Sequence, residues 1–193
     1  MLNRELWFPT PVYYGEVDVT GCESKCMEYE KPKSEFQDNG YSDNMQKDPQ
    51  FKELFDDILK ESQHVFNENY DTRKGGFKIL NAWVNITKAE EFHKLHVHPN
   101  ADYSGCVYIK TPENCGNIFF EDPNFIAKMD MMNLNNMQRT VVNIPTVEYT
   151  PTVGKLLFFP NWLRHSVLQN HSGETRISIA FNLALDFKDK LIR

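Results

Sequence analysis

The sequence predicts a mainly β fold of two packed sheets with one supporting helix, and two observations lead to this prediction. From Phe77 onward, short apolar stretches recur between Gly, Pro and Asn residues, which is typical of a sandwich or barrel. Before that region, residues 49–69 carry apolar side chains at helical spacing, and such a helix needs a sheet to lie against. With 193 residues and 40% hydrophobic content, we expect a single domain over residues 1–193 with one sizeable core.

Residues 1–75 are expected to form a strand, a loop and a helix that support a core of residues 76–193. Residues 6–17 are β-like, and their two prolines confine them to an edge or an irregular entry strand. Residues 31–47 are polar and turn-rich, so we expect a loop there. Asp48 followed by Pro49 is an N-cap with proline at the first helical position, so the helix begins here and runs to about Asn69.

Three strands in the second part are expected to have one apolar face and one face of aromatic and hydrogen-bonding groups. Such a mixed face lines a polar cavity or meets solvent, and we favour the cavity because it gathers aromatic rings with a single arginine. Residues 124–138 interrupt the strands, and we interpret them as an insertion that folds over the pocket. The expected strands are residues 77–87, 93–98, 104–110, 117–120, 140–144, 147–150, 155–159, 164–168 and 175–184.

Charge and composition exclude several classes of partner. The net charge is −6, and no Lys/Arg cluster is present, so we expect no non-specific nucleic-acid binding and no membrane-surface binding. No apolar run approaches the ~20 residues of a membrane span, and no signal-peptide core stands at the N-terminus, so we expect a cytoplasmic protein. The four cysteines lack C-x-x-C spacing and are interpreted as reduced thiols.

Three histidines form a candidate metal site. His96-Val97-His98 places two imidazoles on one face of a strand, because side chains alternate with a period of two. His165 follows a Phe-Phe-Pro turn and begins another strand. Each signal alone is weak, but two packed sheets that bring them together would create a three-point site with open positions for water, oxygen or substrate. His93 is expected on the opposite strand face from His96 and outside the ligand set.

These residues resemble the small 2-oxoglutarate- and Fe(II)-dependent oxygenases of the jelly-roll, or double-stranded β-helix, class. The resemblance runs from about Trp83 to Leu183, and the Leu-Trp-Phe-Pro-Thr-Pro-Val start is also similar to one compact branch. It implies a double-stranded β-helix, also called cupin-like, with the N-terminal helix packed on one sheet. It further implies His96 as the first Fe(II) ligand and His165 as the distal one.

The resemblance also implies a 2-oxoglutarate site. Arg176 and Ser178 match the Arg-x-Ser pair that binds the far carboxylate of 2-oxoglutarate in this class. Tyr108 resembles the strand tyrosine that often hydrogen-bonds to the same carboxylate. Asn85, on the mixed face of its own strand, completes the residues that we expect around this cofactor.

The chain departs from the family pattern at the carboxylate ligand, where His98 stands. Either His98 is itself a ligand, or Asp102 supplies the carboxylate, or water fills the position. We favour His98, because residues two apart share a strand face, whereas Asp102 requires the Pro99-Asn100 turn to curl back. A set of three histidines still binds Fe(II), although the departure puts the usual dependence on a carboxylate in question.

We therefore expect an oxygenase, a hydroxylase that couples oxidative decarboxylation of 2-oxoglutarate to oxidation of a small molecule or protein side chain. A homodimer is left open. The alternative is a cupin-type metalloenzyme that uses Asp102 with the same three histidines and needs no 2-oxoglutarate. Arg176-x-Ser178 favours the oxygenase, since a cupin has no need of that pair. A third alternative is a binding module without enzymatic activity, in which the histidines are incidental.

Overall fold

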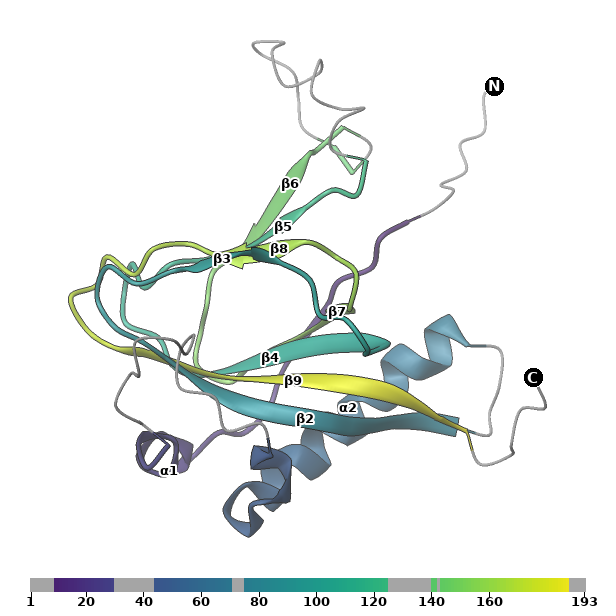
Figure 1. Ribbon diagram of the computed structural model, residues 1–193, viewed down its shortest axis with the longest axis horizontal. Helices are drawn as coiled ribbons and strands as arrows, with labels where there is room; N and C mark the ends of the chain where they lie inside the picture. The colour runs from purple at the N-terminus through teal and green to yellow at the C-terminus, as the bar shows by residue number, and fades with distance from the viewer. Residues whose placement is uncertain (1–8, 30–43, 71–74, 125–139, 142, 188–193) are drawn as a thin grey trace.

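Two antiparallel sheets pack face to face, with helices beneath the larger sheet (Figure 1). The computed structural model describes residues 9–29, 44–70, 75–124, 140–141 and 143–187. The larger sheet has the strand order β1-β7-β4-β9-β2, and the smaller sheet has the order β3-β8-β5-β6. The chain thus passes repeatedly between the two sheets. The predicted mainly β fold, a double-stranded β-helix with a helix on one sheet, is confirmed.

The elements follow the predicted order along the chain, except that α1 and η1 were not predicted and no strand forms at the described residues within 140–144. The larger sheet consists of β1 (Tyr13–Glu16), β2 (Gly75–Thr87), β4 (Tyr103–Lys110), β7 (Lys155–Pro160) and β9 (Arg176–Phe187). The smaller sheet consists of β3 (His93–His96), β5 (Ile118–Glu121), β6 (Thr146–Tyr149) and β8 (His165–Val167). The helical segments are α1 (Cys22–Met27), η1 (Met45–Lys47), η2 (Pro49–Phe51) and α2 (Lys52–Asn69).

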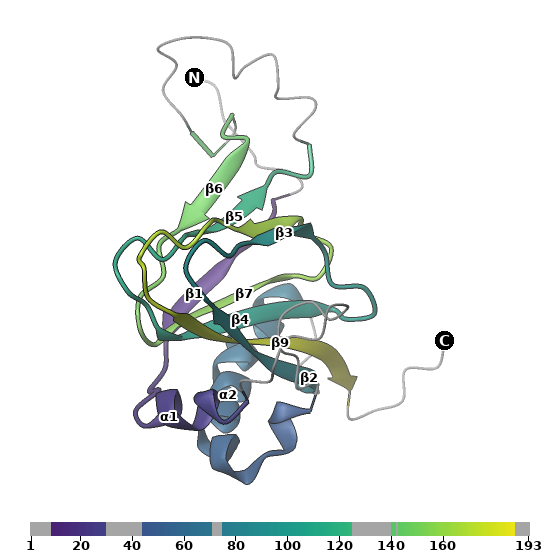
Figure 2. The ribbon, with the colours of Figure 1, turned by 60° about the vertical axis from the view of Figure 1, so that its left-hand side comes forward.

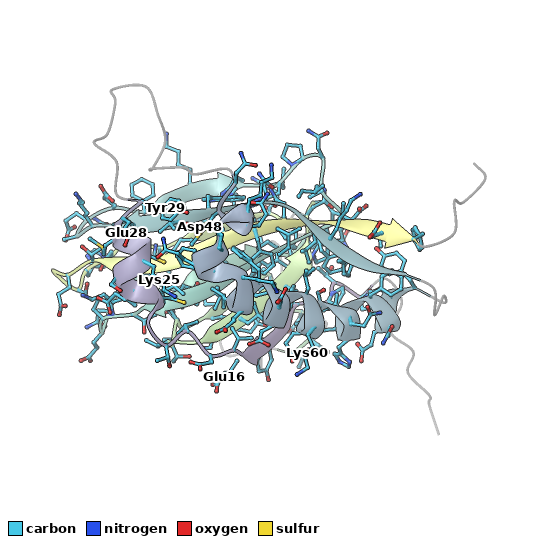
Figure 3. The ribbon with its side chains drawn as sticks, turned by 90° about the horizontal axis from the view of Figure 1, so that it is seen from below. Glu16, Lys25, Glu28, Tyr29, Asp48 and Lys60 are labelled. Carbon is cyan, nitrogen blue, oxygen red and sulfur yellow. The ribbon has the colours of Figure 1, made fainter. Side chains whose placement is uncertain are left out.

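The predicted helix start is confirmed. Asp48 accepts a hydrogen bond from the backbone N–H of Gln50 at 2.9 Å, and Pro49 opens the first helical turn. The hydroxyl of Tyr29, just after α1, donates to the same carboxylate (Figure 3). Asp48 therefore ties α1 to the start of α2, and both helices lie across the outer face of the larger sheet (Figures 2 and 3).

The main core lies between these helices and the larger sheet. The apolar faces of β2, β4 and β9 point to the helices as predicted, so the mixed faces point to the smaller sheet. Leu80 is an exception, with 40% of its surface exposed, because the β2–β9 register shifts between Ile79 and Asn81. The core side chains include Leu54, Ile58, Val65, Phe66, Ala82, Val84, Val107, Ile109, Ile177, Ile179, Phe181 and Leu183.

Gln46 of η1 covers the free edge of β2 at this bulge. Its side-chain Nε2 donates to the carbonyl of Leu80 at 3.0 Å, and its Oε1 accepts from the N–H of Ala82 at 3.1 Å. One amide side chain thereby imitates the pairing of a further strand. It satisfies two backbone groups that an edge strand would otherwise leave open.

Some predictions differ from the structure or lie outside the described residues. The strand predicted at residues 140–144 is wrong, because Asn143 accepts from the N–H of Thr140 at 2.7 Å and holds a turn. Residues 125–139 of the expected insertion lie outside the described residues. All four cysteines are buried free thiols. In the described part of the chain, none of the helices has the length and apolar character that crossing a membrane requires.

Candidate metal centre and cofactor pocket

The three predicted histidines converge between the two sheets. His96 ends β3 and His165 begins β8, and the two are register partners in the smaller sheet. His98 follows two residues after His96. One ring nitrogen from each of the three lies within 4.8 Å of the other two. The Nε2 atoms of His98 and His165 are 3.1 Å apart.

Backbone carbonyls fix the ring orientation of two of these histidines. The Nδ1 atom of His96 lies 2.7 Å from the carbonyl oxygen of Lys94, and Nδ1 of His165 lies 2.8 Å from that of Leu163. A carbonyl oxygen can only accept, so each Nδ1 carries the proton. The Nε2 atom of each ring is therefore left with a free lone pair.

His98 is held by its backbone and by an aromatic ring. Its N–H donates to the carbonyl of Asn161 at 2.9 Å, and the Asn161 side chain donates to the carbonyl of His98 at 3.1 Å. These bonds fix the segment after β3 against the turn that precedes β8. The His98 ring stacks on Trp83 with centroids 5.7 Å apart and an interplanar angle of 20°.

Burial keeps the imidazoles of His98 and His165 neutral at physiological pH. Desolvation, together with the neighbouring His96, lowers the pKa of His165 to about 3 and the pKa of His98 to about 4. Neutral imidazole is the form that binds a metal ion, because the ligand nitrogen must be unprotonated.

The donor set fits a first-row transition metal. Two nitrogens bonded to one ion at about 2.1 Å and at right angles are about 3.0 Å apart, close to the 3.1 Å between the Nε2 atoms of His98 and His165. Imidazole donors suit iron, zinc, copper and nickel. The three side chains therefore supply one face of a coordination sphere.

A cavity of about 250 Å³ opens beside the histidines. Its floor is the mixed face of β2, β4 and β9, and its roof comes from β3, β5 and β8. Trp83 and Phe159 give it apolar walls, and Arg176 lies at the end away from His98. Among the described residues that line it, no side chain is acidic and Arg176 alone is permanently charged.

Arg176 is buried and keeps N–H groups that are available for further hydrogen bonds. Only 1% of its surface is exposed. Its Nη1 donates to the carbonyls of Cys115 and Gly116 at 2.8 and 3.0 Å, and its Nη2 donates to the Thr87 hydroxyl at 3.0 Å. Nε has no partner among the described residues. The Nε–H and one Nη2–H remain, and two adjacent guanidinium donors can hold a carboxylate by parallel bonds.

A polar row crosses the floor of the cavity beside Arg176. Asn85 on β2, Ser178 on β9 and Tyr108 on β4 are register partners. The Asn85 Oδ1 atom is a second buried polar atom without a partner in the described part of the chain. Burial raises the pKa of Tyr108 well above 10, so its hydroxyl is a neutral donor. Unsatisfied buried polar atoms in one cavity indicate that a polar ligand completes it.

Asp102 does not join the convergent histidines. Its carboxylate accepts a hydrogen bond from the backbone N–H of Leu185 at 2.8 Å. Among the described residues, the metal-ligating cluster contains His96, His98 and His165. The geometry therefore does not support the four-ligand cupin set that requires Asp102.

The prediction that His93 faces away from His96 is wrong. The β3–β8 register shifts between these two residues, so the alternation breaks and both side chains line the cavity. His93 Nε2 lies 3.5 Å from the Thr87 hydroxyl, which also accepts a hydrogen bond from Arg176. Thr87 itself gives no signal in the sequence, because its role depends on its pairing with a residue far along the chain.

Residues 81–182, more than half of the chain, match the sequence model of a family described as "Putative 2OG-Fe(II) oxygenase". The matched region contains every metal and cofactor residue that the sequence predicts. No protein with a curated description matches the chain.

The fold is similar to that of several solved 2-oxoglutarate enzymes. The non-heme α-ketoglutarate-dependent epimerase SnoN from nogalamycin biosynthesis has a TM-score of 0.65 at 11% identity, over 95% of this chain and 83% of that chain. HygX from Streptomyces hygroscopicus, with nickel, 2-oxoglutarate and hygromycin B bound, has a TM-score of 0.60 at 13% identity, over 91% of this chain and 83% of that chain. A Pseudomonas putida prolyl-4-hydroxylase has a TM-score of 0.57 at 12% identity, over 94% of this chain and 89% of that chain. At such identities the likeness concerns the fold alone.

Proposed function

The chain belongs to the 2OG-Fe(II) oxygenase family, and from this premise we propose that it hydroxylates its primary substrate at an Fe(II) ion held by His96, His98 and His165. It is a non-haem oxygenase whose cofactors are Fe(II) and 2-oxoglutarate. The neutral state of the buried imidazoles and the 3.1 Å between two of their Nε2 atoms support the proposed ligand set.

The remaining donors of Arg176 support it as the residue that holds the distal carboxylate of 2-oxoglutarate. Its Nε–H and one Nη2–H would form charge-assisted bonds at a buried position in the cavity. Ser178 and Tyr108 carry hydroxyl donors on the adjacent strands, and Asn85 adds an amide. When bound, Fe(II) with 2-oxoglutarate and O₂ supplies the oxidation, which yields succinate, CO₂ and one oxygen atom for the substrate.

The protein's own residues place and isolate the reactants. The carbonyls behind His96 and His165 keep the Nε2 lone pairs directed inward, while Trp83 and Phe159 give the centre apolar walls. A cavity of about 250 Å³ that also accommodates 2-oxoglutarate leaves room for a compact group. We therefore propose as substrate a small molecule or a single side chain of a protein.

The buried Arg176 is the observation that favours an oxygenase over a cupin-type enzyme. A metal centre that needs no diacid has no use for a guanidinium with an unpaired Nε in the same cavity. The net charge of −6 supports the proposal that nucleic acid is not bound non-specifically. The free thiols support a reducing compartment, and we propose the cytoplasm.

Anaerobic titration of the Fe(II)-loaded protein with 2-oxoglutarate tests the proposal. We expect the weak visible charge-transfer band of the chelate to appear and saturate at one equivalent. We also expect 2-oxoglutarate to protect the wild-type protein against thermal unfolding, and Arg176→Ala to lose this protection at near-normal iron content. A protein that binds one iron but develops no band and gains no protection would be a metalloenzyme of another kind.

A further inference from the structure

The end of the cavity away from Arg176 carries two asparagine side chains that the proposed cofactor site does not use. Asn81 on β2 and Asn182 on β9 are register partners, and both are half-buried and line the cavity. We call these two residues the amide pair. Asn182 lies six residues beyond Arg176 on β9, which corresponds to about 20 Å of extended strand. The amide pair and the guanidinium therefore belong to opposite ends of one cavity floor.

The proposed metal centre lies between these two ends. The His98 ring stacks on Trp83 with centroids 5.7 Å apart, and Trp83 is the register partner of Ala180. On the cavity face of β9, Ala180 stands between Arg176 and Asn182 and is one alternation step, about 6.7 Å, from Asn182. A 2-oxoglutarate held by Arg176 would occupy the other side of the metal. The amide pair therefore borders the side that is left for the primary substrate.

This end of the cavity offers no charge to an ionic substrate. Among the described residues that line the cavity, Arg176 alone is permanently charged, and no side chain is acidic. An ammonium group would therefore lose its hydration there without meeting an opposite charge, which costs free energy. The two carboxylates of 2-oxoglutarate would already pair with Arg176 and Fe(II), so a further anion would gain little. An uncharged polar group meets neither obstacle.

The amide pair keeps hydrogen-bonding groups for a ligand. Asn182 Nδ2 donates to Asn81 Oδ1 at 3.0 Å, and the fully buried Ser104 hydroxyl donates to Asn182 Oδ1 at 2.8 Å. Within the described part of the chain, Asn81 makes no other side-chain hydrogen bond, so its Nδ2 keeps two N–H donors and its Oδ1 keeps one lone pair. A carboxamide has a carbonyl for such a donor and an N–H for such an acceptor.

Asn81 is held in this position from outside the sheet. It follows the β2–β9 register shift that separates it from Ile79, and a bulge of this kind redirects a side chain beside an active site. Gln46 bonds to the carbonyl of Leu80 and to the N–H of Ala82, the residues on either side of Asn81. A side chain fixed in this way loses little conformational freedom when a ligand binds.

We propose that the amide pair recognises the primary substrate and selects an uncharged carboxamide group. The inference rests on the proposed function and names the class of substrate. Asn81 donates Nδ2–H to the substrate carbonyl and accepts the substrate N–H at Oδ1, while Asn182 and Ser104 fix the orientation of the Asn81 amide. These bonds hold the substrate beside the Fe(II) ion, on the side away from 2-oxoglutarate.

The test uses the full-length protein loaded with Co(II) and saturated with 2-oxoglutarate, and its probes are acetamide and methylammonium. Both probes are small methyl compounds, one uncharged and one cationic. Paramagnetic broadening of the probe's methyl proton resonance, relative to the Zn(II)-loaded protein, measures binding near the metal. The wild type should broaden acetamide saturably and should not broaden methylammonium. Because 2-oxoglutarate then fills the Arg176 end, bound acetamide lies elsewhere in the cavity.

Two substitutions of Asn81 test its role. Asn81→Leu has a similar size and no polar group, so it should weaken acetamide binding at least about fivefold, as expected for the loss of one or two hydrogen bonds. Asn81→Asp keeps the acceptor for Asn182 and adds a negative charge, so it should broaden methylammonium and lose acetamide. Asn117→Leu is the matched control and should behave like the wild type, because the Asn117 amide donates to Glu148 at 2.9 Å and does not line the cavity.

The outcomes separate this inference from the proposed function. A wild-type protein that binds neither Co(II) nor 2-oxoglutarate would overturn the proposed function itself. If both bind but acetamide shows no saturable broadening, or if methylammonium is broadened as strongly, the proposed function stands and the substrate class is refuted. Equal acetamide binding by folded Asn81→Leu would refute the role of Asn81. If thermal unfolding shows that Asn81→Leu does not fold, Asn81→Asp decides, and an unchanged preference for acetamide would refute the inference.

Discussion

Replacement of Arg176 by lysine separates the effect of its paired hydrogen bonds to a carboxylate from the effect of its positive charge. Lysine keeps one positive charge on a stem of similar length but loses the two adjacent donors of the guanidinium. In the structure, Nε–H and one Nη2–H of Arg176 remain for the ligand, so the variant loses at least one charge-assisted hydrogen bond. Such a bond contributes about 1.5–3 kcal/mol, so 2-oxoglutarate should bind roughly 10–150-fold more weakly.

The assay is an anaerobic titration of Fe(II)-loaded protein, followed through the charge-transfer band. Iron content should stay near one equivalent, because Arg176 is not in the histidine cluster. Arg164→Lys is the matched control, since the Arg164 side chain is 57% exposed and pairs with Glu121 at 2.6 Å. It should leave the 2-oxoglutarate affinity unchanged. A dissociation constant for Arg176→Lys within twofold of the wild type, at equal iron content, would refute the assignment of Arg176.

Three further predictions concern the ligand set, the buried histidines and the core. His98→Ala should lose most bound iron, whereas Asp102→Asn should retain it, as metal analysis after desalting would show; the reverse result would restore the cupin ligand set. The metal-free protein should lose stability as pH falls below 6.5, because the unfolded chain then takes up protons that folded His165, with its pKa of about 3, does not. At pH 5, the loss of unfolding free energy relative to pH 7 should be about 2 kcal/mol from His165, with a smaller share from the part-exposed His98. Urea unfolding at pH 7 and pH 5 measures this loss, and equal stability at the two pH values would contradict the burial argument. Gly105→Ala should destabilise the fold by at least about 1–3 kcal/mol, because an added Cβ would lie 2.4 Å from the Phe181 ring, and an unchanged melting temperature would show that the core can yield there.

Local alternation predicted most of the larger sheet correctly. The period of two in β2, β4 and β9 assigned Trp83, Tyr108 and Arg176 to one face, and these side chains do share one cavity. Alternation is a property of consecutive residues, so the sequence carries it directly. It failed at His93 and Leu80, where a register shift depends on the partner strand and leaves no mark in the local pattern.

The candidate site was only partly accessible from the sequence. The convergence of His96 with His165 follows from the pairing of β3 with β8. The family resemblance implied that both residues are ligands of one metal, but the strand pairing was not predicted. The contacts of Thr87 with Arg176 and of Asn182 with Ser104 join residues 89 and 78 positions apart. Such pairings exist only after the sheet has formed its register.

The side chain of Gln46 has a consequence for solubility. Two backbone groups of β2, the Leu80 carbonyl and the Ala82 N–H, point outward on the flank of the larger sheet and end on that one amide. Without the Gln46 side chain, this backbone donor and acceptor would be free to pair with a strand of another molecule along the edge of β2. A single glutamine in a short helical turn thus helps to keep neighbouring molecules in a concentrated solution from joining sheet to sheet.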